Sequence, residues 1–564
     1  MIRGFSLAAS ALVPILALAV AGMGSAAGRQ SPEGELSDQA RELWRQIETQ
    51  DDSSDDALAR WVDTLLVDVE RFQSEPAFRH DVLAAIAAAR PLEVAPEVVH
   101  GALGALSRRL HFSEMEGVEV AWGTVPRGSL GREVSLGRTL DERDAHWRRL
   151  TLPAATSPID VSIYSLPSPL VDEEEARSFV RAVLEWAPER RILILADLPR
   201  SRSLAALASD DRVALAQTWG AAYSPWPRDP MTFLRNGDGD LLAVVRPNRQ
   251  ATRELDSRMA LELVQELPGG WAGGGEDPHW GTSPVPFHNG NLLSGDARLW
   301  ASLHTFEPRI LELLGLDRVP VESFSTAAGL RRYLDAAERA ANELGALYGR
   351  TIEWVHDLPA NEVEPSTAAR SMVGLGGGAG FDLDSIVTIL PAVDGDEAAA
   401  LVGSLREGER LLVTASDEEL TAFASFYGFR PEAFGPAQAL SVAQRSERAG
   451  GLEAFLDRVA RHLEREGLRV GRLPLLLTPM ELVEHAADYP DSHFLIGWNN
   501  VVLERVGDRW RAEGFSSALA AGDRVARARF DALGYQLGLL PALRESVLRN
   551  GGYRCASNHI RGTD

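Results

Sequence analysis

The sequence predicts an α/β fold for residues 159–564, and two observations predict it. The run Arg191–Ala196 is short and almost entirely apolar, as expected of a strand that is buried on both faces. It follows Glu173–Trp186, a run that reads as an amphipathic helix. Strand-like and helix-like runs then alternate to the end of the chain, which is typical of α/β proteins.

The other predicted elements extend the same pattern. Further strands are expected at 118–122, 161–164, 241–245, 299–302, 385–390 and 501–503, and further helices at 326–347, 452–466 and 521–533. The segment 236–240 contains Asn-Gly and Asp-Gly pairs, which predict a hairpin turn. Glycine-rich turns at 288–291, 376–380 and 550–552 stand just before several strands. These repeated turn-plus-strand units indicate a modular fold, although the repeat in the residues themselves is faint.

The N-terminus predicts a signal peptide over residues 1–27. Arg3 precedes an apolar stretch from Phe5 to about Met23, and the small residues Ser25 and Ala27 follow. Cleavage is expected near Ala27, which would leave a secreted or periplasmic protein with no stable membrane insertion. The apolar stretch is also long enough for an uncleaved anchor, so that alternative stays open.

The rest of the chain divides into three predicted parts. Residues 28–112 carry apolar side chains mostly three and four positions apart, which predicts a helical accessory domain with a structural or partner-binding role. Residues 113–158 form a β-rich connecting segment, and residues 159–564 form the catalytic domain. The length of 564 residues exceeds what one hydrophobic core normally holds.

The formal net charge of −24 speaks against a nucleic-acid partner, because a phosphate backbone requires clustered Lys and Arg. A negative surface is compatible with a cationic substrate, since it raises the local concentration of cations. It also serves general solubility, so the charge alone does not assign a function.

The chain has one cysteine, Cys555. A single cysteine in an exported protein cannot form an internal disulfide, so it is either a core residue or a thiol kept for chemistry. It follows Gly551 and Gly552, and glycines allow a close approach of the backbone to a ligand. Arg554 beside it supplies positive charge, which predicts a lowered thiol pKa and a more nucleophilic sulfur.

Two acidic clusters accompany this cysteine in the sequence. Asp229 stands between two prolines in a loop that begins with Trp226, where a carboxylate and an aromatic ring can receive a planar cation. The alternative is a rigid loop in which the aspartate caps a turn. Asp382 and Asp384 precede an apolar strand, and alternation places them on one face. They can bind a cation or a metal, or form a solvated start to the strand.

Three segments, in this order, resemble the guanidino-group-modifying enzymes, which include agmatine, arginine and protein-arginine deiminases. The resemblance spans residues 159–561 and excludes the helical N-terminal part. The family has a Trp-x-Arg-Asp loop, a Gly-Gly-Asn strand start and a final Gly-Gly-x-x-Cys-x-Thr. These are matched by Trp226, Arg228 and Asp229, partly by Asn289–Leu293, and by Gly551, Gly552 and Cys555, with Ser557 at the Thr position.

The resemblance implies a pentein fold, a five-bladed α/β propeller of ββαβ-like modules around a pseudo-fivefold axis. It also implies that Asp229 and Asp384 hold a guanidinium while Cys555 attacks its central carbon. A general acid/base then protonates the departing ammonia and activates water, which gives a ureido product such as citrulline. Substrate-binding roles are expected for Trp226, Arg228, Asn291 and Arg554.

The chain departs from the family at the acid/base. The family has His-x-Asp where this chain has Asp382-Leu383-Asp384, so Asp382 stands at the histidine position. An ionised aspartate near a cation suits a base but is a poor proton donor. Arg554 also replaces the usual histidine before the cysteine. Three other histidines are alternative candidates for the acid/base: His288, His356 and His559.

The leading hypothesis is an exported deiminase-like hydrolase of an arginine derivative. Peptidyl-arginine is preferred because of the predicted export and because residues 555–561 resemble the ending of protein-arginine deiminases, while free arginine and agmatine stay open. No cofactor is expected, and calcium is suggested by the family resemblance alone. One alternative is a catalytically silent family member that binds arginine-containing ligands or partners. Another is an unrelated α/β protein with chance motif matches.

Overall fold

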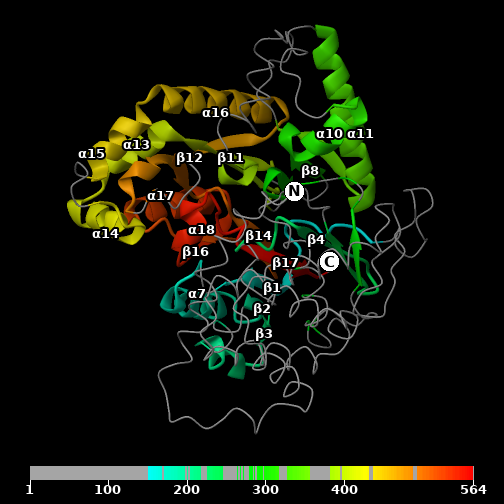
Figure 1. Ribbon diagram of the computed structural model, residues 1–564, viewed down its shortest axis with the longest axis horizontal. Coiled ribbons are helices and arrows are strands. Elements are labelled where there is room, and N and C mark those ends of the chain that lie inside the picture. The colour runs from blue at the N-terminus through cyan, green and yellow to red at the C-terminus, as the bar shows by residue number, and fades with distance from the viewer. Residues whose placement is uncertain are drawn as a thin grey trace, which may run out of the picture.

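The computed structural model describes residues 150–562 with gaps (Figure 1). The gaps are 168–169, 197–199, 201–202, 218–224, much of 246–288, 296–297, 317–326, 356–381, 394–396, 431–435, 485 and 487–491. The predicted signal peptide, the helical segment 28–112 and the strand at 118–122 lie outside the described residues. From residue 159 onward strands and helices alternate, which confirms the predicted α/β class.

The described residues form five sheets. The first sheet contains β1 (Ile159–Ser165), β2 (Arg191–Ala196), β3 (Val213–Gln217) and β17 (Ser557–Arg561). The second contains β4 (Met231–Arg235), β5 (Leu241–Val245) and β6 (His279–Thr282), and the third β7 (Leu292–Ser294), β8 (Arg298–Ala301) and β9 (Thr351–Trp354). The fourth contains β10 (Val387–Leu390), β11 (Ala399–Ser404), β12 (Arg469–Pro479) and β13 (His493–Gly497), and the fifth β14 (Val502–Val506), β15 (Arg509–Phe515) and β16 (Tyr535–Leu540).

Helices lie mainly in the connections between strands. The α-helices are α7 (Glu173–Trp186), α10 (Glu307–Leu314), α11 (Ala327–Tyr348), α13 (Leu405–Thr414), α14 (Asp417–Tyr427), α15 (Pro436–Gln444), α16 (Glu447–Arg465), α17 (Ala520–Asp531) and α18 (Arg544–Leu548). Short 3-10 helices are η4 (Leu207–Ser209), η6 (Asn289–Asn291), η7 (Leu303–Phe306), η10 (Leu383–Ser385) and η11 (Met480–Leu482). Among the described residues, no helix is both long and apolar enough to cross a bilayer.

All five sheets repeat one pairing pattern. In each sheet a first strand pairs antiparallel with a second, and the second pairs parallel with a third. A parallel pair requires a crossover connection. The crossovers contain α7 between β1 and β2, α10 and α11 between β8 and β9, α13 to α16 between β11 and β12, and α17 between β15 and β16. The modular organisation expected from the glycine-rich turns is therefore present in the strand pairing.

The first crossover shows why the sequence folds this way. The Asp172 carboxylate accepts hydrogen bonds from the backbone N–H groups of Glu174 and Glu175, which caps the start of α7. Apolar residues three and four apart, from Ala176 to Val183, form the buried face of the helix. Strand β2 lies between two parallel neighbours, β1 and β3, which explains its continuous apolar run. Both elements have the bounds that the sequence predicted.

The other predicted elements agree within a few residues. The helices expected at 326–347, 452–466 and 521–533 are α11, α16 and α17. The hairpin expected at 236–240 joins β4 to β5, and the side-chain oxygen of Asn236 accepts hydrogen bonds from the backbone N–H groups of Asp238 and Asp240. An asparagine side chain that bonds the backbone in this way stabilises a turn, so the turn reading is confirmed.

The late strand β17 belongs to the first sheet, where it pairs antiparallel with β1 (Figure 1). A buried ion cluster adjoins this connection. The Arg190 guanidinium donates to Glu513 at 2.8 Å and to Glu504 at 2.6 Å, and the Tyr553 hydroxyl donates to Glu513 at 2.7 Å. The start of β2, the hairpin β14–β15 and the segment just before Cys555 are thereby held together.

Candidate active site

Cys555 lies in the turn between α18 and β17 and is 2% exposed. Its sulfur lies 4.0 Å from Oδ1 and 3.9 Å from Oδ2 of Asp384, a residue far away in the sequence. The Ser557 hydroxyl donates to the carbonyl of Tyr553 at 2.8 Å, and the Ala556 N–H donates to the carbonyl of Gly552 at 3.0 Å. These two bonds close the turn and fix the direction of the thiol.

The two glycines before the cysteine are needed for close packing. A Cβ atom at Gly551 would overlap the Trp226 ring, and one at Gly552 would overlap the Asn500 side chain. The Trp226 indole N–H also donates to the Ser546 hydroxyl at 3.1 Å. The ring of Trp226 is therefore packed against the cysteine turn, and the Gly-Gly pair brings the first and third sequence motifs together.

The loop that carries Arg228 and Asp229 is held by two asparagines. The Asn289 amide donates to the carbonyls of Arg228 at 2.9 Å and Met231 at 2.8 Å. The Asn558 amide donates to the carbonyls of Pro227 at 3.1 Å and Met231 at 3.0 Å. Because Asn289 lies in η6 and Asn558 in β17, all three sequence motifs are tied to this one loop.

Asp384 is completely buried, and it lies in the 3-10 helix η10. The sequence predicted a strand from residue 385 that placed Asp382 and Asp384 on one face; this was wrong, because β10 begins only at Val387. The 3-10 turn nevertheless brings both acids to the cysteine, and one ligand atom of each lies within 4.8 Å of the others and of the sulfur. Asp229 is 3% exposed, and its charge acts on both Asp384 and Cys555.

The carboxylates determine the charge state of the thiol. Burial, followed by the negative charges of Asp384, Asp229 and Asp382, raises the pKa of Cys555 well above its ordinary value. The prediction that Arg554 lowers this pKa was wrong, because Arg554 is engaged elsewhere. Its guanidinium forms an ion pair with Asp384 at 3.1 Å and donates to the Leu292 carbonyl. In this state of the site the sulfur is a protonated thiol.

Asp384 titrates near neutrality. Burial raises the pKa of its carboxyl to about 7, and the positive charge of Arg554 opposes that rise. The carboxyl therefore exchanges a proton in the range where a general acid/base works best. Its two oxygens lie 4.0 Å and 3.9 Å from the sulfur, which makes Asp384 a candidate for the general acid/base.

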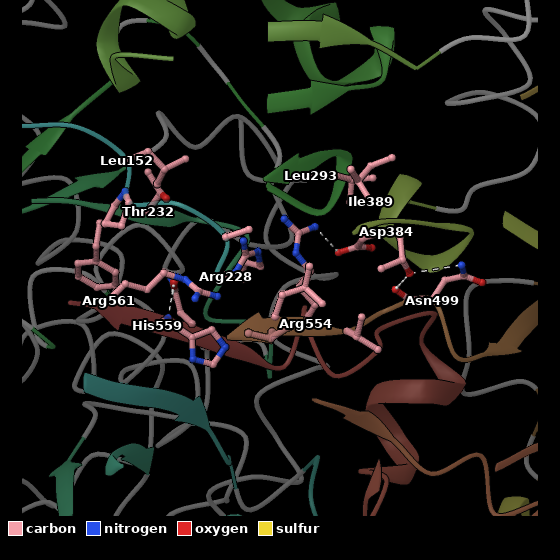
Figure 2. Close-up of a pocket in the computed structure, with 18 of the residues that line it drawn as sticks. Leu152, Arg228, Thr232, Leu293, Asp384, Ile389, Asn499, Arg554, His559 and Arg561 are labelled. Carbon is pink, nitrogen blue, oxygen red and sulfur yellow. Dashed lines mark hydrogen bonds and ion pairs between the residues drawn. The ribbon is translucent and has the colours of Figure 1, made fainter. Parts of the chain in front are cut away.

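Three arginines, Arg228, Arg554 and Arg561, line a cavity of about 60 Å³ beside these acids (Figure 2). Figure 2 shows Arg228 and Arg561 on one side of the cavity, and Arg554 on the other side in its ion pair with Asp384. Burial lowers the pKa of Arg228, and so do the charges of Arg554 and Arg561. The Nε atom of Arg228 is buried without a hydrogen-bond partner in the described part of the chain.

Of the three histidine candidates for the acid/base, His559 is the one that lies among the described residues. His559 lies in β17 and lines the same cavity; its ring contacts the hydroxyls of Ser162 at 3.3 Å and Ser557 at 3.1 Å. Burial and the neighbouring arginines lower its pKa well below the ordinary value, so the ring is neutral. His288 and His356 lie outside the described residues, as does the side chain of Asn291.

Two site residues were missed by the sequence reasoning. The Asn500 amide donates to the Cys555 sulfur at 3.5 Å, and its oxygen accepts from the Arg554 N–H at 2.6 Å. Asn500 stands in an Asn-Asn pair before a predicted strand, which was a signal in the sequence. Arg561 was read only as part of the chain's ending, and nothing in its sequence surroundings indicated that it lines a cavity.

Asp382, Asp384 and Cys555 form the group of potential metal ligands found in the described residues. Calcium, which the family resemblance suggested, requires six to eight oxygen ligands. This group offers two carboxylates and a thiol, and the Arg554 guanidinium already holds Asp384. These residues do not fit a calcium ion.

Several solved structures are similar to the chain. The agmatine deiminase of C. jejuni is 14% identical with a TM-score of 0.43, and the match covers 74% of this chain and 97% of that one. The agmatine deiminase of Enterococcus faecalis is 10% identical with a TM-score of 0.40, covering 73% and 95%. An amidinotransferase from Microseira wollei is 11% identical with a TM-score of 0.31, covering 74% and 98%.

No protein-family description matches the chain, and no curated protein matches it. Agmatine deiminases belong to the enzymes that the sequence motifs resemble.

Proposed function

We propose that this chain is a cysteine hydrolase of the guanidino-group-modifying superfamily, with its five sheets as the five blades of a pentein propeller. It converts the guanidinium of an arginine derivative into a ureido group and ammonia. One observation carries the proposal: the sulfur of the chain's single cysteine lies 3.9 Å and 4.0 Å from the carboxylate oxygens of a completely buried aspartate. The thiol itself is uncharged and Arg554 already pairs with Asp384, so the negative charge available to a cationic substrate is that of Asp229 and Asp382.

The charges favour a cationic substrate. Asp229, Asp382 and Asp384 all raise the pKa of Cys555, so a bound guanidinium that balances these carboxylates lowers it again. The thiolate then forms only when substrate is present. The two negatively charged groups that a planar guanidinium requires are Asp229 and Asp382, since Arg554 already neutralises Asp384.

We assign the acid/base role to Asp384 in place of the missing family histidine. The thiol proton passes to the Asp384 carboxylate, and the sulfur forms a bond to the central guanidinium carbon. The proton then goes to the departing nitrogen, and the C–N bond breaks to release ammonia. Asp384 next takes a proton from water, whose oxygen replaces the sulfur on the carbon. The C–S bond breaks, Asp384 returns its proton to the sulfur, and the new hydroxyl loses its proton to solvent, which gives the ureido product and restores the thiol.

Peptidyl-arginine is the substrate we propose first, because of the predicted signal peptide and the C-terminal ending. Agmatine is the principal competitor, since two of the similar structures are agmatine deiminases. Ureido-group formation by the full chain should be measured with peptidyl-arginine, free arginine and agmatine. Turnover that disappears in Cys555→Ala and persists in Arg212→Gln, a surface control, supports the hydrolase. No turnover on any substrate overturns it.

A matched pair of alkylating agents tests the cation preference without turnover. Chloroacetamidine is cationic and chloroacetamide is neutral, and they have similar size. We expect the cationic reagent to modify Cys555 at least about tenfold faster, because one added ion pair contributes on the order of 1.4 kcal/mol. Equal rates would contradict a guanidinium site at this cysteine.

The Arg554–Asp384 ion pair favours a second candidate, a silent binding protein. The pair occupies one of the two carboxylates that the resemblance assigns to the substrate, and the family histidine is absent. Calorimetric titration of Cys555→Ala with arginine, agmatine and an arginine peptide separates the candidates. Ligand binding by Cys555→Ala, together with no turnover by the wild-type chain, supports the catalytically silent binding protein. Export is a separate prediction, which cell fractionation of the full-length chain tests.

A further inference from the structure

We propose that the cavity between Arg228, Arg554 and Arg561 binds a small inorganic anion, held chiefly by the guanidinium groups of Arg228 and Arg561. This cavity, hereafter the arginine cavity, is also lined by Asp384 and His559 (Figure 2). The inference concerns a resident anion and does not depend on the proposed hydrolase activity.

Among the described residues, two of the three arginines at the arginine cavity have no carboxylate in direct contact. Arg554 has an ion pair with Asp384 at 3.1 Å. Across the part of the chain that the structure describes, neither Arg228 nor Arg561 forms an ion pair with a carboxylate. Arg561 donates only to the Ser157 carbonyl, at 2.7 Å. Two guanidinium groups thus line one cavity without an ion pair to the described carboxylates, although Asp384 acts on Arg228, and Glu504 and Glu513 act on Arg561, from a greater distance.

The hydrogen-bond donors are also unsatisfied. The Arg228 Nε atom is buried and has no partner in the described residues, although buried polar groups normally have one. The ring of His559 is neutral, so it adds no positive charge to the cavity and supplies no negative charge to the arginines. An anion would accept from Arg228 and separate two like charges with a negative one.

The titration behaviour supports the same geometry. The charge of Arg561 lowers the pKa of Arg228, and burial lowers the pKa of Arg561 to about 10. Both groups nevertheless remain cationic at neutral pH, because arginine loses its proton only in strongly alkaline solution. The charge of Asp384 partly offsets the repulsion at Arg228, as those of Glu504 and Glu513 do at Arg561, and a bound anion would add a negative charge in direct contact with both groups.

The volume limits the ligand to a small ion. The cavity measures about 60 Å³, and its walls include apolar side chains such as Leu152, Phe233 and Val502. Chloride, bromide and phosphate are small enough to be considered, whereas an extended organic anion such as gluconate is too large. The shared chemistry is a compact anion between two planar guanidinium groups.

Thermal unfolding of the full chain tests the proposal. Sodium chloride and sodium phosphate are each compared with sodium gluconate at the same ionic strength, which removes the general effect of salt screening. Once the anion concentration exceeds the dissociation constant, we expect the midpoint to rise by about 2 °C per tenfold increase in free anion, as mass action requires. The rise should disappear in Arg228→Gln and in Arg561→Gln and persist in Arg212→Gln, a partly exposed control.

A second measurement covers the case that single variants unfold. The ³⁵Cl line width of the wild-type protein in chloride should exceed that of free chloride, and phosphate should narrow it if an oxyanion shares the site. If phosphate alone raises the midpoint and chloride is not broadened, the ligand is the oxyanion. If chloride and phosphate act no differently from gluconate and the line is not broadened, the proposal is overturned. Equal rises in the wild type and in both cavity variants would also overturn it.

Discussion

The side-chain amide of Asn500 donates to the Cys555 sulfur at 3.5 Å, while its carbonyl oxygen accepts from the backbone N–H beside that cysteine at 2.6 Å. The backbone bond fixes which end of the amide faces the sulfur. An N–H donor stabilises a thiolate more than a thiol, so Asn500 partly opposes the carboxylates around Cys555.

Replacement of Asn500 should therefore weaken the nucleophile. Asn500→Asp puts a fourth carboxylate beside the sulfur, and we expect it to slow alkylation of Cys555 more than Asn500→Ala does. Asn500→Ala also leaves the buried Arg554 N–H without its acceptor, at a cost of about 1–3 kcal/mol, whereas Asn500→Asp keeps an oxygen that can accept this bond. The rate of modification by neutral chloroacetamide between pH 7 and 10 measures the effect, because the added carboxylate does not itself attract this reagent. A faster Asn500→Asp variant would contradict the assigned electrostatics.

Asp384 should make stability depend on pH. Its carboxyl has an ordinary pKa of 3.8 and a pKa of about 7 in the folded protein, so the folded chain keeps a proton that the unfolded chain releases. The free energy of unfolding contributed by this group is full below pH 4 and is lost as the pH rises toward 7.

In Asp384→Asn this loss is absent, so the variant gains stability relative to the wild type between pH 5 and 7, by up to a few kcal/mol. Urea unfolding at several pH values measures the difference. Asp210→Asn is the control, because the Arg212 guanidinium lowers the pKa of Asp210 to about 2, well below this range. Parallel profiles for the wild type and Asp384→Asn would show that the carboxyl does not titrate there.

Alanine substitutions at Gly551 and Gly450 should change the free energy of unfolding in opposite directions. Gly551→Ala introduces a methyl group where the Trp226 ring lies, so we expect loss of stability and displacement of the cysteine turn. Gly450 lies inside α16 with open space around it, and Gly450→Ala should stabilise the protein by about 0.5–1 kcal/mol. Denaturant midpoints and alkylation rates measure both. An unchanged denaturant midpoint in Gly551→Ala would contradict the position of the Trp226 ring against this glycine.

The buried cluster around Arg190 should be the most sensitive ion pair. Arg190→Gln removes the nearest counter-charge of the buried Glu504 and Glu513 and leaves the more distant Arg511, 4.0 Å from Glu504, which should cost about 3–5 kcal/mol. The partly exposed pair Arg212–Asp210 offers the comparison, since Arg212→Gln should cost less than about 1 kcal/mol. Equal losses of free energy of unfolding in the two variants would contradict the burial of this cluster.

Much of the fold could be predicted from the sequence because its elements carry local signals. Helix α7 has a capping aspartate and one apolar face, and β2 has a continuous apolar run. The start of β10 could not be placed, because the 3-10 turn at Leu383–Ser385 uses the same apolar and acidic residues as a strand would. Local pattern does not separate those two conformations.

Most residues of the candidate site were predicted from the sequence, but their ion pairs and pKa shifts were not. The glycines and the cysteine mark a close approach of the backbone, and that approach is real at Trp226 and Asn500. The partner of Arg554 could not be predicted, because it depends on a carboxylate 170 positions away in the sequence. Burial likewise determines the pKa of Asp384, and burial depends on the whole packed structure.

The pairing of β17 with β1 joins segments far apart in the sequence, since the paired residues Ser162 and His559 are 397 positions apart. During synthesis β1 is made well before β17, so the first sheet lacks this neighbour until residues 557–561 have been added. Cys555 directly precedes β17, and its turn is therefore anchored to the first sheet only when this late pairing has formed.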